Sequence, residues 1–122
     1  MKREAVCVIT IFLLCLQSCK DVFEKDISKD VVKMMAPPPS GVLKGEKVDF
    51  VWEEMEGAEK YRLVVVKPSF ATIRNYICDT IVKNTYFRMS LDTGAYEWSV
   101  QAQNFAYESR RNIHSFTVVN HE

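Results

Sequence analysis

The sequence predicts an all-β domain, an antiparallel β-sandwich of about seven strands that spans residues 31–119. Two observations support this fold class. Short segments carry an apolar side chain at every second position, which is the period of a strand with one buried face. Turn-forming residues such as Gly57 and Gly94 separate these segments at short intervals. No part of the sandwich region carries a convincing amphipathic helix pattern.

The strands are expected in chain order, beginning with an edge strand at residues 31–35. Pro37, Pro38 and Pro39 follow it and lack the backbone N–H that a continuing strand would need. The alternation is cleanest at residues 96–103 and weakest at residues 76–82. The full set of later strands is expected at residues 47–53, 61–66, 76–82, 86–91, 96–103 and 116–118.

The phase of the alternation separates core residues from surface residues. Trp52 and Trp98 fall on the inward phase, so we expect them to pack in the core rather than to form a stacking platform for a sugar. Val64 and Val66 fall on the outward phase and predict an apolar stripe, a feature that can mark a protein interface. Val51 extends this stripe only if it lies in the same sheet.

The N-terminus carries an export signal rather than part of the fold. Lys2 and Arg3 precede a twelve-residue apolar run at residues 5–16, which is shorter than the ~20 residues of a spanning helix. The run ends in Leu16-Gln17-Ser18-Cys19, which resembles a bacterial lipobox. The resemblance implies a signal peptide at residues 1–18 and lipid attachment at Cys19, and more than one acyl chain there gives stable anchoring in a membrane.

The mature chain then divides into a tether at residues 19–30, the sandwich at residues 31–119 and a tail at residues 120–122. The charged segment after Cys19 suits a spacer or a short, weak helix. Lys20 after the lipidated residue argues against retention at the inner membrane. Lys20-Asp21 also resembles part of a surface-export signal of gut-dwelling Gram-negative bacteria, and a plain solvated tether is the alternative. We therefore expect an outer-membrane location and leave open the cell surface or the periplasmic face.

Composition argues against several function classes. The chain has 16 basic and 16 acidic residues, so it lacks the basic footprint of a nucleic-acid-binding protein. Cys7 and Cys15 lie in the expected signal, and the lipobox resemblance implies that Cys19 would carry lipid, which leaves Cys78 as the one ordinary thiol and predicts no internal disulfide. We expect no cofactor, no metal site and no catalytic residue. His114 has no Cys or Asp at metal-ligand spacing, and neither a nucleophile motif nor a phosphate loop occurs.

Two motifs resemble the fibronectin type III and related immunoglobulin-like domains. They are Trp52…Gly57-Ala58-x-x-Tyr61 and Leu91-x-x-Gly94-x-Tyr96-x-Trp98-x-Val100-x-Ala102-x-Asn104. The resemblance covers residues 31–119 and implies a corner in which the Tyr caps a turn that the Gly permits. The gap between Leu91 and Tyr96 is one residue shorter than in animal modules, which leaves the geometry of this corner open. The family implies adhesion, spacing or ligand presentation rather than catalysis.

One loop is the leading candidate for a binding site. Residues 105–112 join the last two strands and include Phe105, Tyr107, Arg110 and Arg111, and aromatic and Arg side chains dominate interface hot spots. The alternative is that the aromatic side chains fold back on the end of the sandwich. The acidic residues at 53–59 allow a calcium site or, as we favour, a solvated turn.

Asp79-Thr80-Ile81 resembles a short bacterial acceptor motif for O-glycosylation, which implies Thr80 as the modified residue. Taken together, these features predict a lipid-anchored, non-catalytic binding or assembly module of the cell envelope, which contacts a protein or a glycan through its loops. The first alternative is a structural accessory subunit of an outer-membrane complex, held through Val64 and Val66. The second is a degenerate hydrolase.

Overall fold

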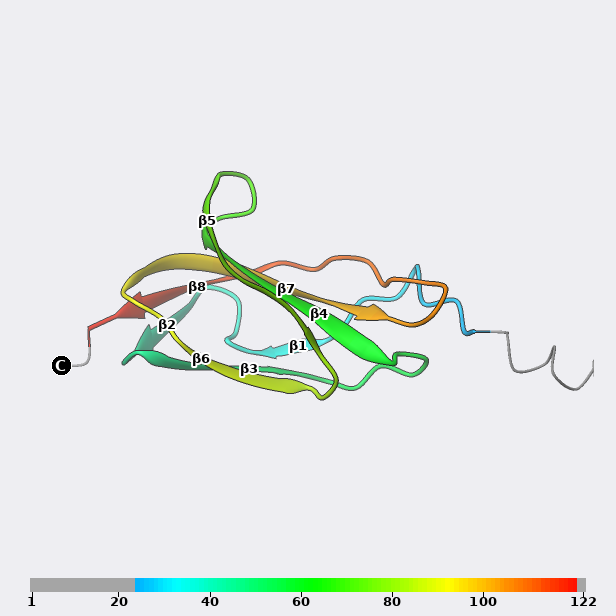
Figure 1. The fold of residues 1–122 in the computed structure, drawn as a ribbon. Coiled ribbons are helices and arrows are strands. Elements are labelled where there is room, and N and C mark those ends of the chain that lie inside the picture. The colour runs from blue at the N-terminus through cyan, green and yellow to red at the C-terminus, as the bar shows by residue number, and fades with distance from the viewer. Residues whose placement is uncertain (1–23, 121–122) are drawn as a thin grey trace, which may run out of the picture.

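The computed structural model describes residues 24–120, which form eight β-strands in two packed sheets (Figure 1). The strands are β1 (Met34–Ala36), β2 (Gly41–Lys44), β3 (Lys47–Trp52), β4 (Lys60–Pro68), β5 (Ile73–Val82), β6 (Tyr86–Ser90), β7 (Gly94–Gln103) and β8 (His114–Val119). The predicted sandwich is confirmed. Over the same 97 described positions there is no helix of the length and apolarity that a membrane crossing requires. The signal peptide and Cys19 lie outside the described residues.

One sheet has the strand order β1-β3-β6 and the other β2-β8-β7-β4-β5. Neighbouring strands are antiparallel except β2 and β8, which run parallel. The chain leaves the first sheet after β1 and joins the second at β2, and the predicted break at Pro37, Pro38 and Pro39 is this crossing. Prolines cannot donate to a ladder, so the strand cannot continue beside β3.

Two strands differ from the expected set. The four-residue β2 was not expected, and its Val42 is exposed and its Leu43 half-buried. The weak strand expected at residues 76–82 is part of the ten-residue β5 at the edge of the larger sheet. Two register shifts in the β4–β5 pairing interrupt the alternation of β5, and this irregularity explains the weak pattern.

The core lies between the sheets and is built on aromatic residues. Trp52 and Trp98 are 2% and 0% exposed, as their inward phase predicted. The Phe50 ring meets the Trp98 and Phe116 rings edge-to-face, with centroids 5.1 and 5.8 Å apart. Tyr96 stacks on Phe116 at 5.3 Å. Contacts of this kind stabilise the core beyond the apolar area that they bury. Phe50 belongs to one sheet and the other three rings to the second, so one aromatic cluster joins the two sheets.

The corner before β7 forms despite the shortened spacing. The Tyr96 hydroxyl donates to the carbonyl of Asp92 at 2.7 Å, and the Leu91 N–H donates to the carbonyl of Glu46 at 2.6 Å. Leu91 is buried below the turn, and Gly94 has a φ of 146°, a conformation that L side chains rarely adopt. The expected roles of the Leu, the Gly and the Tyr are all present.

The predicted apolar stripe on the outer face of β4 is wrong. Val64 and Val66 do point away from the core, yet they are 2% and 0% exposed. Phe70 donates its backbone N–H to the Glu97 carboxylate, opposite Val66, at 2.6 Å. The Arg111 guanidinium lies 5.0 Å from the centre of the Phe70 ring.

Arg111 also donates to the side-chain oxygen of Gln101 at 3.3 Å, so this cover reaches along β7 from Glu97 to Gln101. Ser99, which lies between them and opposite Val64, is 0% exposed. Val51 belongs to the other sheet and does not extend the stripe. The surface that a structural subunit was expected to use is therefore covered by the chain itself.

Candidate functional site

The sandwich has two ends of different character (Figure 1). At the N-terminal end lie residues 24–27, the β3–β4 turn and the loop that follows β7. At the distal end lie the β2–β3 turn, the β6–β7 turn and Asn120. Strand β7 connects the two ends, since it begins at Gly94 and finishes at Gln103.

The loop after β7 is held in place by the side chain of Asn104, which is 7% exposed. Its Oδ1 accepts from the backbone N–H groups of Ala106 and Tyr107, at 3.1 and 2.8 Å. Its Nδ2 donates to the carbonyls of Lys25 and Gly57, at 2.8 and 3.0 Å. An Asn that bonds the backbone two and three residues ahead fixes a tight turn. Asn104 thus joins the loop to the N-terminal segment and to the β3–β4 turn.

The close approach of these segments needs Gly57. This glycine has a φ of 89°, and a Cβ added there would lie 3.0–3.1 Å from side-chain atoms of Lys25 and Ile27. Ile27 is itself fully buried. The N-terminal segment is consequently packed against the sandwich from residue 25 onward.

The structure does not bring the four predicted loop residues together. Phe105 is 83% exposed and Tyr107 37% exposed at the tip of the Asn104 turn, so the Phe105 side chain does not fold back. Arg110 donates its backbone N–H to the carbonyl of Asp30 at 2.9 Å. Arg111 stacks on Phe70 on the outer sheet face. A ligand-binding role for this loop stays a prediction, and any such contact involves its aromatic tip rather than all four side chains.

Two carboxyl groups, those of Glu24 and Glu59, lie beside this tip. The carboxyl groups of Glu24 and Glu59 share a hydrogen bond, which is the main cause of the raised pKa of Glu24. The Phe105 backbone N–H bonds to Glu24 and opposes this rise in pKa. Glu53 and Glu56 face Lys33 and Lys25 at 3.9 and 3.4 Å, in exposed ion pairs. Between residues 24 and 120, no three His, Cys, Asp or Glu side chains are grouped as ligands for a metal ion.

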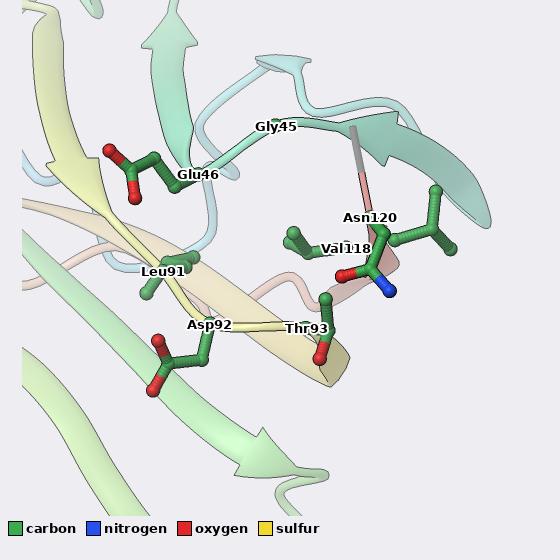
Figure 2. Close-up of a pocket in the computed structure, with 8 residues that line it drawn as sticks. Gly45, Glu46, Leu91, Asp92, Thr93, Val118 and Asn120 are labelled. Atoms are coloured by element: carbon green, nitrogen blue, oxygen red, sulfur yellow. The ribbon is translucent and has the colours of Figure 1, made fainter. Parts of the chain in front are cut away.

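The distal end carries an open groove of about 560 Å³ (Figure 2). The β2–β3 turn, the β6–β7 turn and the end of β8 supply its walls. The lining residues are Gly45, Glu46, Leu91, Asp92, Thr93, Val118, Val119 and Asn120. Figure 2 shows Glu46 and Asp92 on one side of the groove, and Thr93 and Asn120 on the other.

A second hollow of about 360 Å³ shares Glu46, Leu91 and Asp92 with this groove and continues along β5. Lys67 lines it, donates to the carbonyl of Thr93 at 3.3 Å and lies 5.2 Å from the centre of the Tyr96 ring. We call the two hollows together the distal groove. Its floor is apolar and its rim carries carboxylates, amides and hydroxyls. None of its lining residues is a His or a Cys, so its chemistry suits binding through hydrogen bonds and charge.

The distal groove has no signature in the sequence. The corner motif at residues 91–96 places these residues at one end of a sandwich. The β2–β3 turn and the end of β8, however, come beside them only through the strand order. Glu46 and Asn120, separated by 74 positions, carry no local pattern that links them.

Thr80, the predicted modification site, and Cys78, the ordinary thiol, both lie on β5. Thr80 lies half-buried on the edge strand β5, opposite Leu63 on β4. Its neighbour Asp79 accepts two hydrogen bonds from Arg62, at 2.9 and 2.8 Å, and these lower the pKa of the Asp79 carboxyl. Modification of Thr80 stays a prediction. Cys78 is half-buried, and burial raises the pKa of its thiol, which disfavours the reactive thiolate.

Comparison with known proteins identifies the fold. No protein-family model matches the chain, and no curated protein matches its sequence. Among solved structures, the fibronectin(III)-like modules of Clostridium thermocellum CbhA align with a TM-score of 0.55 and 17% identity, over 75% of this chain and 99% of that one. An Fn3-like protein from Clostridium thermocellum aligns with a TM-score of 0.52 and 15% identity, over 78% and 96%.

A fibronectin type III domain derived from human KIAA0970 protein aligns with a TM-score of 0.57 and 13% identity, over 79% of this chain and 77% of that one. At such low identity the likeness concerns the fold alone. The sheet arrangement, the corner at Tyr96 and these alignments agree, and residues 24–120 have a fibronectin type III-like fold.

Proposed function

We propose that this chain is a lipid-anchored, non-catalytic binding module of the bacterial outer membrane that presents its distal groove to a protein or a glycan. One observation carries the proposal. The chain enters the sandwich at one end, through Lys25 and Ile27, and the distal groove lies at the other. A module anchored at Cys19 thus holds the groove away from the membrane.

The lengths of two chain segments set the distance of each end of the sandwich from the lipid attachment point. Five peptide steps separate Cys19 from Glu24, and extended chain spans at most ~3.5 Å per residue, so the N-terminal end lies within about 18 Å of the lipid attachment point. Strand β7 has ten residues. At ~3.4 Å per residue it carries the distal groove roughly 30 Å further from the anchor.

The chemistry of the groove favours a ligand with a cationic group. Glu46 and Asp92 place two carboxylates on its rim against the ammonium of Lys67, and Leu91 and Val118 provide an apolar floor. Both features suit the long side chain of a Lys or Arg in a partner protein, because its methylene stem packs on apolar surface and its head group pairs with carboxylates. An amino sugar of a glycan offers the same charge on a more compact body.

Site-specific photocrosslinking in intact cells tests the proposal. A benzophenone amino acid replaces Thr93 at the rim of the groove, and in a matched variant it replaces Ile81, which is 48% exposed on β5. We expect a discrete adduct from position 93, absent from position 81 and lost when Glu46→Gln and Asp92→Asn are combined. Protease digestion or glycan staining of the adduct then identifies the class of partner. Adducts from position 81 alone, or from neither position, would contradict a binding role for the groove.

A further inference from the structure

The tip of the loop after β7 exposes an unusual amount of aromatic surface on a fixed backbone. Phe105 is 83% exposed, the highest fraction among the large hydrophobic side chains of residues 24–120. Asn104 fixes the turn that carries it through four side-chain hydrogen bonds. The Asn104 N–H donates to the Tyr107 carbonyl at 3.0 Å. The tip therefore presents its rings to the surroundings without a large loss of loop entropy on binding.

This aromatic tip lies beside the point at which the N-terminal segment enters the sandwich. The Asn104 side-chain amide donates to the carbonyl of Lys25 at 2.8 Å, so the residue before Phe105 is tied directly to the entering segment. Figure 1 shows the loop after β7 at the same end of the molecule as the entering chain. Whatever holds Cys19 is consequently within about 18 Å of this end.

We propose that Phe105 and Tyr107 rest on the lipid surface into which Cys19 is anchored and fix the sandwich in one orientation on it. This inference rests on the proposed lipid anchor. The length of chain outside the structure supplies the argument for the occupant, since so short a connection keeps the tip near the bilayer. Aromatic rings are stabilised at the interface between lipid head groups and acyl chains, because their apolar surface is removed from water there.

The charges around the tip favour a lipid surface of low net charge. Glu24 and Glu59 lie beside Phe105, and the nearby Glu56 is paired with Lys25. Carboxylates are repelled by anionic head groups at low ionic strength, and salt screens this repulsion. The contact is therefore expected to be closer on zwitterionic vesicles than on vesicles rich in phosphatidylglycerol.

Fluorescence quenching on vesicles tests the lipid contact. Phe105→Trp places an indole at the tip, and the matched Val42→Trp places one on β2 of the same protein, where the native side chain is 66% exposed. Trp52 and Trp98 are buried in both variants and give the same background. The full-length lipidated proteins are reconstituted into phosphatidylcholine vesicles that contain a lipid with a nitroxide on its acyl chain.

We expect the Phe105→Trp variant to lose at least twice as large a fraction of its added emission as the Val42→Trp variant. Equal quenching of the two variants, with both proteins floating with the vesicles, would overturn the lipid contact and leave the anchor intact. Failure of both proteins to float would instead refute the lipid anchor and, with it, this inference.

Discussion

The hydroxyl of Tyr96 donates a hydrogen bond to the carbonyl of Asp92, 2.7 Å away and four residues earlier in the chain. This bond closes the turn that forms one wall of the distal groove. Lys67 lies over the same Tyr96 ring and donates to the carbonyl of Thr93, so the turn is held from two sides. Tyr96, which is buried in the core, thereby fixes this wall of the groove.

Tyr96→Phe is expected to destabilise the domain by about 1–2 kcal/mol, because it removes this hydrogen bond and leaves a carbonyl in a partly buried turn without its donor. Urea unfolding measures the change. Tyr76→Phe is the matched control, since the Tyr76 side chain is 66% exposed on β5. Equal stability of the two variants would show that the corner contributes nothing to folding.

Trp98→Ala is expected to cost about 3–5 kcal/mol, since it removes a fully buried ring that packs against Phe50. A small domain has roughly 5–15 kcal/mol in total, so the variant should melt at a much lower temperature. Phe105→Ala serves as control and should change the free energy of unfolding by less than about 0.5 kcal/mol. An unchanged melting temperature for Trp98→Ala would mean that the phase assigned to β7 is inverted.

Asn104→Ala is expected to loosen the N-terminal end and to cost about 2 kcal/mol, because four hydrogen bonds from one side chain are lost. Amide hydrogen exchange at Ala106 and Tyr107 should become faster, while the amides in the middle of β7 keep their protection. Asn84→Ala provides the comparison, since the Asn84 side chain accepts a single long bond of 3.4 Å from Tyr86. Slow exchange at residues 106 and 107 in Asn104→Ala would contradict the assigned role of this side chain.

The Arg62–Asp79 pair predicts a specific pH dependence of stability. Hydrogen bonds from Arg62 lower the pKa of Asp79 below 3.8, so the pair contributes stability above pH 3.8 and loses it as the pH falls through the lowered pKa. Arg62→Met removes this contribution. The stability difference between the native protein and the variant is therefore expected to be largest near neutral pH and to vanish in acid.

Carboxyl NMR titration checks the same point directly. The pKa of Asp79 should rise toward 3.8 in Arg62→Met and stay low in Arg88→Met, which disrupts the separate pair with Asp49. An Asp79 pKa that is the same in all three proteins would refute the assignment. Because both partners are about 40% exposed, we expect the effect on stability to be modest.

The strand pattern was predictable because each strand buries one face, and a period of two is a local property of the chain. Trp52 and Trp98 are found inside for this reason. The same reasoning identified the outward direction of Val64 and Val66 but not their burial. Phe70 and Arg111, which belong to two connecting segments, meet over the outer face of this sheet. The period-two pattern of a strand carries no information about connecting segments that fold back over its outer face.

At both ends of the sandwich, the local sequence does not reveal which segments become neighbours in the fold. Phe105 stood out by residue type, and its exposure agrees with its place in a loop. Its position beside Glu24 depends on how Asn104 joins segments that are 79 residues apart in sequence. The distal groove depends on two turns and the end of β8, which meet only in the folded sandwich. Local sequence determines which residues lie in turns, and the strand order determines which turns are neighbours.

The lipid anchor at Cys19 is the central claim, and fractionation of cells that express native protein or Cys19→Ala tests it most directly. Metabolic labelling with an alkyne fatty acid accompanies the fractionation. We expect the native protein to carry the label and to sediment with outer membranes. The variant should be unlabelled and soluble, with the thermal stability of its sandwich unchanged. A Cys19→Ala protein that stays labelled and in the membrane fraction would contradict the account.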